Sequence, residues 1–172
     1  MILKEHIHGI EAEERGQGEA IAESMIEMSK LEVPIISIVI GEGSSGGALA
    51  IGVSNKIYML ENSIYSILSP EGYSSILWKD STKAKEAAQK MKLTADDLYK
   101  MKIIDKIILE NTHNKKDISE QEFNEIAIRL RNEIVKEINS YSKMTNEQIK
   151  EERYQKYRNI KGFYEMSIDK EE

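Results

Sequence analysis

A glycine-rich turn, Gly41 to Gly47, constrains the fold of this 172-residue chain more than any other feature. It follows residues 33–40 (VPIISIVI), a nearly continuous β-branched run that predicts a strand buried on both faces, as in α/β proteins. It precedes residues 48–53 (ALAIGV), which predict a buried helix because they are apolar nearly all round. Strand, turn and helix therefore follow one another without a spacer, and the turn uses the backbone freedom of glycine.

The main-chain N–H groups of this turn are candidates for ligand binding. Those at the start of the following helix lack intrahelical partners and lie at the positive end of the helix dipole. Backbone groups alone can thus form a site for an anion or an oxyanion. The same residues also fit a tight turn whose small side chains serve packing, so the residues by themselves leave the two interpretations equally open.

The turn also satisfies a dinucleotide-binding pattern. Gly41, Gly43 and Gly46 form G-x-G-x-x-G between a strand and a helix, and Glu61 ends the next strand, where a ribose ligand is expected. Only about ten residues separate Gly46 from that strand, which is short for a crossover, and no regular βαβ units follow. A nicotinamide-dependent oxidoreductase is therefore a remote alternative, and the lack of a Lys-Ser/Thr pair argues against a P-loop.

Patterns elsewhere in the chain predict the order of the other elements. A helix over residues 11–31 comes first, and residues 56–60, 64–68 and 103–109 predict strands. Helices are predicted over residues 82–91 and after four start signals: Ser69-Pro70, Thr94 with Asp97, Ser119 with Glu122, and Thr145 with Gln148. We therefore expect an α/β core over residues 1–110 and a helical C-terminal extension over residues 111–172.

Composition argues against several functions. The net charge of −6 gives no support for nucleic-acid binding through a basic surface. The absence of cysteine excludes disulfides, thiolate metal sites and cysteine nucleophiles. Residues 1–10 lack a signal-peptide core, and no apolar run reaches the ~18 residues of a membrane-spanning helix, so a soluble cytoplasmic protein is expected.

Two further clusters have ordinary interpretations. His6 and His8 are spaced like a metal-binding pair on a strand, but no further ligands are evident, so two solvated histidines near the terminus are expected. Residues 151–158 (EERYQKYR) mix basic and aromatic side chains that could contact a CoA phosphate or a partner chain. A solvated helix face is the default expectation for this segment.

Several separate motifs, in order along the chain, resemble the α-subunit family of bacterial acetyl-CoA carboxylase carboxyltransferases. The resemblance is close over roughly residues 9–110 and looser in the C-terminal tail. It is carried by AEERGQ (12–17), EAIA (19–22), Met28-Ser29, VIGEG (39–43), SGGALAIGV (45–53), SPEG (69–72), SILWK (75–79) and Arg153-Tyr154-Gln155.

The resemblance implies a crotonase-like fold, which is a spiral of ββα turns, and a role in fatty acid biosynthesis. Members of the family transfer a carboxyl group from carboxybiotin, on its carrier protein, to acetyl-CoA, which gives malonyl-CoA. The implied partners are the carboxyltransferase β subunit in an α2β2 assembly, the biotin carboxyl carrier protein and biotin carboxylase. No metal is expected on this chain, because the β subunit of the family carries the zinc.

The resemblance also assigns site residues. Carboxyl transfer generates oxyanions on the biotin ureido ring and on the thioester, and two preorganised N–H donors can stabilise each of them. The backbone N–H groups of Gly46 and Gly47 are assigned to the biotin-side oxyanion hole. Substrate binding is assigned to Gly43, Ser44, Ser45, Glu71 and Gly72.

The start of the chain departs from the family. A full family member has a long N-terminal half, and it shows Gly-Ala-Tyr-Pro-Gly where this chain has residues 5–9 (EHIHG), of which only Gly9 agrees. We therefore expect a spiral that is incomplete at its N-terminus, exposed apolar strand edges, and activity that depends on a complementing polypeptide. A catalytically incompetent binding or assembly piece of the same complex is the alternative.

Overall fold

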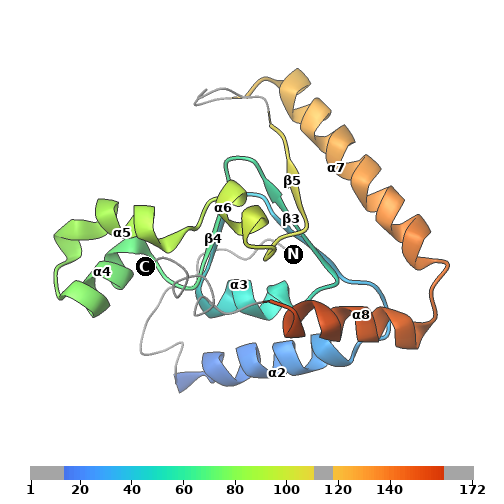
Figure 1. Cartoon of the computed structure of the whole chain (residues 1–172), viewed down its shortest axis with the longest axis horizontal. Coiled ribbons are helices and arrows are strands. Elements are labelled where there is room, and N and C mark those ends of the chain that lie inside the picture. Colours follow the sequence, from blue (N-terminus) through green and yellow to red (C-terminus); the bar gives the residue numbers. More distant parts are fainter. Residues whose placement is uncertain (1–13, 111–117, 161–172) are drawn as a thin grey trace, which may run out of the picture.

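The computed structural model describes residues 14–110 and 118–160, which form two parallel sheets surrounded by helices (Figure 1). Strands β1 (Ile36–Val39), β3 (Lys56–Leu60) and β5 (Lys106–Ile108) form the first sheet, in the order β1-β3-β5. Strands β2 (Glu42–Ser44) and β4 (Ile64–Ser66) form the second. Strand β3 has a neighbour on each edge, whereas β1 pairs only with β3 among the described residues.

A ββα unit occurs twice along the chain. Strand β1 leads to β2 and then to helix α3 (Ser45–Gly52), and β3 leads to β4 and then to helix α4 (Pro70–Trp78). The second unit lies beside the first, because β3 pairs with β1 and β4 pairs with β2, both in parallel. The stacked ββα turns expected from the sequence are therefore confirmed.

The remaining helices are α2 (Gln17–Lys30), α5 (Ala84–Met91), α6 (Ala95–Lys100), α7 (Glu120–Tyr141) and α8 (Asn146–Arg158). Of these, α6, α7 and α8 begin at the start signals that the sequence predicts. An N-cap side chain accepts a first-turn N–H at the start of α4, α6, α7 and α8: Ser69, Thr94, Ser119 and Thr145. The last two also form the predicted capping boxes, with Glu122 and Gln148.

Two burial predictions are wrong. Strand β1 lies at the edge of its sheet, and Ser37 is its only fully buried residue. Ile40, directly after this strand, is 64% exposed, and Leu49 of α3 is 43% exposed. A continuous apolar run predicts that a segment forms a strand or a helix. How much of that strand or helix is buried depends on which other elements pack against it.

Element boundaries also differ from the predictions. The first helix is interrupted, since α2 begins after Gly16, which has a left-handed φ of 76°. Part of the glycine-rich turn is strand β2, because it pairs with β4, a contact that local sequence does not reveal. A 3-10 turn at Ser81–Lys83 precedes α5, and β4 and β5 are shorter than predicted. The loop at 111–116, His6 and His8 lie outside the described residues.

The core is built on the two faces of β3. Successive side chains of a strand point to opposite faces, so Ile57 and Met59 share one face and Tyr58 lies on the other. The main apolar cluster contains Ile57, Met59, Ala95, Leu98 and Ile104, which places α6 on the first face. On the second face the hydroxyl of Tyr58 donates to the carboxylate of Glu137 in α7, at 2.8 Å.

Helix α8 is fixed to this core by a buried arginine. Arg153 is 1% exposed, and its guanidinium donates to the carbonyl oxygens of Met28, Leu31 and Val33 at 2.9, 2.6 and 2.6 Å. It also donates to Oδ1 of Asn55 at 2.9 and 3.1 Å. One side chain therefore joins the end of α2, the segment that enters β1, and the turn before β3.

Ion pairs extend this contact along one side of α8. Lys56 pairs with Glu152 at 2.9 Å, and Lys156 pairs with Asp105 at 2.5 Å. The expectation of a solvated face is therefore wrong for this side of the helix. It holds for Tyr154, which is 56% exposed.

Replacing Arg153 by methionine should destabilise the protein. The change keeps much of the side-chain volume but leaves three main-chain carbonyls and Asn55 without their charged donor. We expect a loss of about 3 kcal/mol in the free energy of unfolding, measured by urea titration. Arg158→Met, at an exposed position of the same helix, should change it by less than about 0.5 kcal/mol. Equal losses of stability in the two variants would contradict this structural role of Arg153.

The stability of the protein should fall in acid in part through Glu152. Burial favours a higher pKa for this carboxyl, but hydrogen bonds and charge from Lys56 outweigh it and leave the pKa below its usual range. Such a group stabilises the fold fully above its unfolded-state pKa, and this stabilisation is lost as the pH falls through the lowered pKa. In urea titrations across the acidic range, the free energy of unfolding of Glu152→Gln should therefore depend less on pH than that of the unmodified chain. The matched change Glu151→Gln, at an exposed neighbour, should leave the pH dependence of the unmodified chain in place.

Candidate functional site

The predicted oxyanion hole lies in the first turn of α3. Ser44 is the N-cap residue, and its side chain caps none of the N–H groups of the helix. Gly46 and Gly47 follow in the first turn, where an N–H has no intrahelical acceptor. Within the described residues, no group accepts a hydrogen bond from either N–H. As far as residues 14–110 and 118–160 are concerned, both donors are therefore open to an acceptor at the positive end of the helix dipole.

Ser45 forms the corner between strand β2 and this helix. Its φ of 62° is left-handed, which costs a residue with a Cβ roughly 1–2 kcal/mol. Ser44 before it is extended, so the chain direction changes sharply at Ser45. Backbone strain of this kind occurs at ligand sites where the surrounding structure holds it in place.

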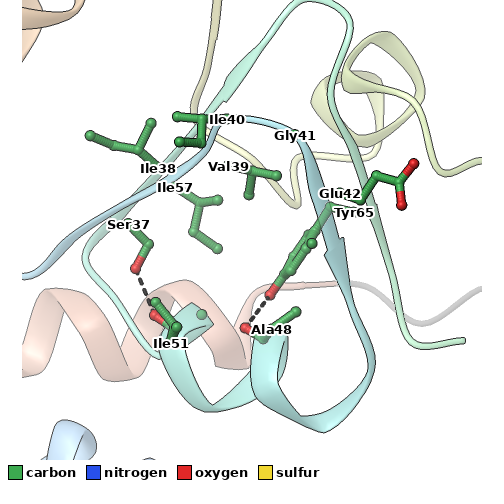
Figure 2. Close-up of a pocket in the computed structure, with 12 residues that line it drawn as sticks. Ser37, Ile38, Val39, Ile40, Gly41, Glu42, Ala48, Ile51, Ile57 and Tyr65 are labelled. Carbon is green, nitrogen blue, oxygen red and sulfur yellow. Dashed lines mark hydrogen bonds between the residues drawn. The ribbon is translucent and has the colours of Figure 1, made fainter. Parts of the chain in front are cut away.

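Hydroxyl groups from three distant segments hold α3. Those of Ser37 in β1 and Tyr65 in β4 donate to main-chain carbonyls of the helix at 2.6 and 3.2 Å (Figure 2). The hydroxyl of Tyr157 in α8 donates to the carbonyl of Gly52 at the end of the helix. The direction of the first-turn N–H groups is therefore set by tertiary contacts.

Tyr65 fits closely against two glycines. A Cβ at Gly43 would lie 2.9 Å from Cδ2 of the Tyr65 ring, and a Cβ at Gly52 would overlap the hydroxyl oxygen. Burial raises the pKa of Tyr65 to about 12, so the hydroxyl stays protonated and remains a donor at neutral pH. Gly43 therefore has the packing role that its sequence allowed, whereas ligand binding by the turn stays a prediction.

Helix α2 packs beside the start of α3 (Figure 1). A Cβ at Gly46 would come within 3.0 Å of Cδ1 of Ile21, so glycine permits this close approach. The absence of a side chain at Gly46 therefore serves the contact with α2 as well as access to the main chain.

Two of the predicted site residues belong to a different helix start. Glu71 and Gly72 lie in the first turn of α4, and β4, which precedes it, pairs in parallel with β2, with Ser44 opposite Ser66. Because the carboxyl ends of parallel strands meet at one edge of a sheet, the starts of α3 and α4 follow the same edge. The N–H of Gly72 already donates to Oγ of Ser69 at 3.1 Å, whereas the Glu71 side chain is exposed.

A cavity of about 240 Å³ lies between β1, β2 and α3 (Figure 2). Its lining is mostly apolar: Ser37, Ile38, Val39, Ile40, Gly41, Glu42, Gly43, Ala48, Ile51, Gly52, Ile57 and Tyr65. Gly43 is the only one of the predicted site residues that contributes to it. The cavity is therefore distinct from the first turn of α3, where the predicted donors lie.

Other groups singled out in the sequence have structural partners or lie elsewhere. The carboxylate of Glu61 accepts a hydrogen bond from the N–H of Glu110 at 2.9 Å, which ties the ends of two strands. Within residues 14–110 and 118–160 no three metal-ligating side chains gather into a cluster. No helix in this part of the chain has both the length and the apolar character needed to cross a bilayer.

Sequence reasoning missed the side chains that position the site. Ser37, Tyr65 and Tyr157 lie on three separate elements, and their hydroxyls act on main-chain carbonyls, which leave no pattern in the sequence. Arg153 was noticed in the basic and aromatic run 151–158 and through the family resemblance, but its buried structural role was not predicted. For Tyr65 the signal is a bulky ring that faces a glycine across two paired strands, since Gly43 lies opposite Tyr65 in the register. This signal can be used only once the pairing of β2 with β4 is known.

Curated relatives match most of this chain. The acetyl-CoA carboxylase carboxyl transferase subunit alpha of Streptococcus sanguinis is 51% identical over 87% of this chain and 56% of its own length. That of Clostridium acetobutylicum is 51% identical over 91% of this chain and 56% of its own length. The protein named subunits beta/alpha from Clostridium tetani is 53% identical over 88% of this chain and 26% of its own. The chain thus spans about half the length of the alpha subunits that it matches.

Solved structures share the fold at low sequence identity. A Pseudomonas malonate decarboxylase hetero-tetramer in complex with coenzyme A has a TM-score of 0.59 at 16% identity, over 76% of this chain and 51% of that chain. The transcarboxylase 12S core, with methylmalonyl-coenzyme A and methylmalonic acid bound, has a TM-score of 0.52 at 19% identity, over 59% of this chain and 22% of that chain. Both are crotonase-like, which confirms the expected fold class.

The family match extends across the glycine-rich turn, both ββα units and α8. Residues 5–161 match the family described as acetyl co-enzyme A carboxylase carboxyltransferase-like. This assignment contradicts the nicotinamide alternative. The chain therefore belongs to the acetyl-CoA carboxylase carboxyltransferase-like family and has its crotonase-like α/β fold.

Proposed function

We propose that this chain acts as the α-type part of an acetyl-CoA carboxylase carboxyltransferase. In this role it promotes transfer of a carboxyl group from carboxybiotin, on its carrier protein, to acetyl-CoA, which gives malonyl-CoA for fatty acid synthesis. The observation that carries the proposal is the pair of N–H groups of Gly46 and Gly47, which have no acceptor among the described residues. The names of the relatives at about half identity support the same reaction.

The chemistry requires donors where negative charge develops. Carboxybiotin supplies the carboxyl group, and its ureido oxygen becomes more negative as that group leaves. The N–H groups of Gly46 and Gly47 would donate to this oxygen, and the fixed orientation of α3 means that they need no rearrangement. One such donor contributes about 3 kcal/mol to stabilising a transition state.

The remaining site residues would surround this pair. Ser45 turns the chain so that β2 ends beside the donors, and Gly43 and Ser44 precede it. Glu71 and the start of α4 follow the neighbouring strand at the same edge, which makes them candidates for contact with the visiting substrate. The N–H of Gly72 is already engaged with Ser69, so its contribution would be space for the ligand.

The partners of the reaction are proposed on the same basis. Relatives named as subunits beta/alpha carry both parts on one chain, which supports a carboxyltransferase β subunit as partner. The α2β2 assembly is proposed from the family resemblance. The biotin carboxyl carrier protein and biotin carboxylase would supply carboxybiotin, and a zinc ion would belong to the β subunit.

A second candidate function is a binding or assembly piece without turnover. The observation that favours it is length, since the chain spans about half of the alpha subunits that it matches. The two candidates differ in one measurable respect. The assembly piece binds the β subunit but forms no product in any mixture.

Reconstitution should separate these candidates. We expect malonyl-CoA when this chain is combined with a β subunit, carboxylated carrier protein, acetyl-CoA and a polypeptide covering the rest of an alpha subunit. Product is followed by transfer of label from the carboxyl group of the carboxylated carrier protein into acid-stable CoA ester. Binding of the β subunit without product in the complete mixture would refute catalysis and support the assembly piece.

Removing one oxyanion donor should lower the rate. Proline at position 47 deletes the N–H without breaking an intrahelical bond, because first-turn N–H groups have none. We expect Gly47→Pro to reduce kcat by roughly 100-fold to 1,000-fold in the reconstituted complex. Gly47→Ala keeps the donor, so the ratio between the two variants isolates the effect of the N–H. Equal rates for the Gly47→Pro and Gly47→Ala variants would exclude this donor from the mechanism. Gly18→Ala, at an open position in α2, is the control and should keep the rate of the unmodified chain.

A further inference from the structure

The C-terminal end of α3 is held by side chains from other elements. The last carbonyls of an α-helix have no partner within the helix, and in α3 those of Ile51 and Gly52 accept hydroxyl protons instead. Ser37 in β1 donates to Ile51 at 2.6 Å, and Tyr157 donates to Gly52. Tyr157 belongs to α8, so a helix near the end of the described chain reaches the helix that carries the predicted oxyanion donors.

The hydroxyl of Tyr157 makes two hydrogen bonds at this point. It donates to the carbonyl of Gly52 and accepts from the main-chain N–H of Ser54 at 2.8 Å. Ser54 is fully buried, so its N–H requires an acceptor within the protein. Burial raises the pKa of Tyr157, so the hydroxyl keeps its proton at neutral pH and remains a donor. One hydroxyl group therefore fixes both residues through which the chain leaves α3 for β3.

A second tyrosine hydroxyl lies against the same end of α3. The hydroxyl of Tyr65 in β4 donates to the carbonyl of Ala48 at 3.2 Å, and a Cβ at Gly52 would overlap its oxygen. Gly52 is thus contacted by a tyrosine from β4 and by Tyr157 from α8. The end of α3 cannot shift toward either side without moving one of the two rings.

Helix α8 also acts on the other end of α3, through α2. Arg153 donates to the carbonyl of Met28 in the last turn of α2 at 2.9 Å. Near the start of α2, Cδ1 of Ile21 lies 3.0 Å from where a Cβ at Gly46 would be. The three helices lie together in Figure 1. Helix α8 therefore restrains the first turn of α3 through α2 and its last turn through Tyr157.

A helix as short as α3 transmits a shift from one end to the other. It has eight residues, and about 9 Å separates Gly46 from Gly52 at a rise of about 1.5 Å per residue. Packed interiors transmit strain over such distances, because they have little free volume. A lost contact at Gly52 therefore changes the direction of the N–H groups of Gly46 and Gly47. Misplacement of a reacting group by about 1 Å can lower a rate roughly 100-fold.

We propose that Tyr157 is a positioning residue for the two oxyanion donors and that α8 takes part in the reaction through this contact. The inference rests on the proposed carboxyl transfer. The hydroxyl of Tyr157 is engaged by Gly52 and Ser54, so it acts through α3 and does not bind the substrate itself. It sets the angle at which the N–H groups of Gly46 and Gly47 meet the ureido oxygen.

Tyr157→Phe removes the hydroxyl and keeps the ring, which is 37% exposed. In the reconstituted complex we expect kcat to fall roughly tenfold, which is less than the loss of a whole donor would cause. The KM for acetyl-CoA should stay within about twofold, because the hydroxyl does not touch this substrate. Tyr99→Phe, which removes a hydroxyl from a side chain 51% exposed on α6, should leave kcat and KM unchanged.

A second background shows whether the effect runs through the oxyanion donors. Gly47→Pro lacks one of the two N–H groups, so Tyr157→Phe has less to misplace there. We expect it to lower kcat by no more than about threefold in this background, compared with about tenfold in the unmodified chain. A contact that only keeps the chain folded would lower the rate by the same factor in both backgrounds.

Glycine amides report the same geometry without turnover. The chain contains ten glycines, so labelling with isotope-enriched glycine gives a small set of amide resonances in the full chain. Tyr157→Phe should shift the amide resonances of Gly46 and Gly47. Tyr99→Phe should leave both resonances in place.

Three results would each overturn the inference. They are an unchanged kcat in Tyr157→Phe, an equal fold loss of kcat in the two backgrounds, and unmoved resonances of Gly46 and Gly47. Absence of malonyl-CoA with the unmodified chain would instead refute the proposed reaction. The glycine resonances would then decide by themselves whether Tyr157 sets the direction of the two N–H groups.

Discussion

The arrangement of this protein depends on the buried guanidinium of Arg153. It donates to carbonyls at the end of α2 and before β1, and to Asn55 before β3, so it connects segments more than ninety residues apart in sequence. A buried cation is costly unless its donors are all used, and here acceptors are supplied by main-chain groups that the end of a helix would otherwise leave unpaired. Helix α8 therefore completes the core although it lies at the far end of the described chain.

The candidate site inherits its geometry from this framework. Helix α3 has only eight residues, too few to be stable by itself, and its orientation comes from Ser37, Tyr65 and Tyr157. The N–H groups of Gly46 and Gly47 are candidate oxyanion donors because none of the described residues accepts a hydrogen bond from them. The strained backbone of Ser45 is maintained by the same surroundings.

Much of the local structure follows from the sequence. The capping residues Ser69, Thr94, Ser119 and Thr145 begin helices as predicted, because a cap acts within three residues of itself. The ββα order and the family were also predictable, since separate motifs occur in the right order. The burial of β1 and α3 was wrongly predicted, because an apolar sequence does not state whether a neighbouring strand is present. The separation of residues 1–110 from 111–172 stays a prediction, although α8 contacts the first part closely.

By itself the sequence determined where α4, α6, α7 and α8 begin, which residues form the glycine-rich turn, and the family to which the chain belongs. These properties rest on interactions between near neighbours or on motifs that survive as residue strings. Tertiary structure alone decided that Gly43 accommodates a tyrosine ring, that Gly46 lies against α2, and that Ser37, Tyr65 and Tyr157 orient α3. Each of these depends on which distant segments meet, and that is set by packing and main-chain pairing across the whole fold.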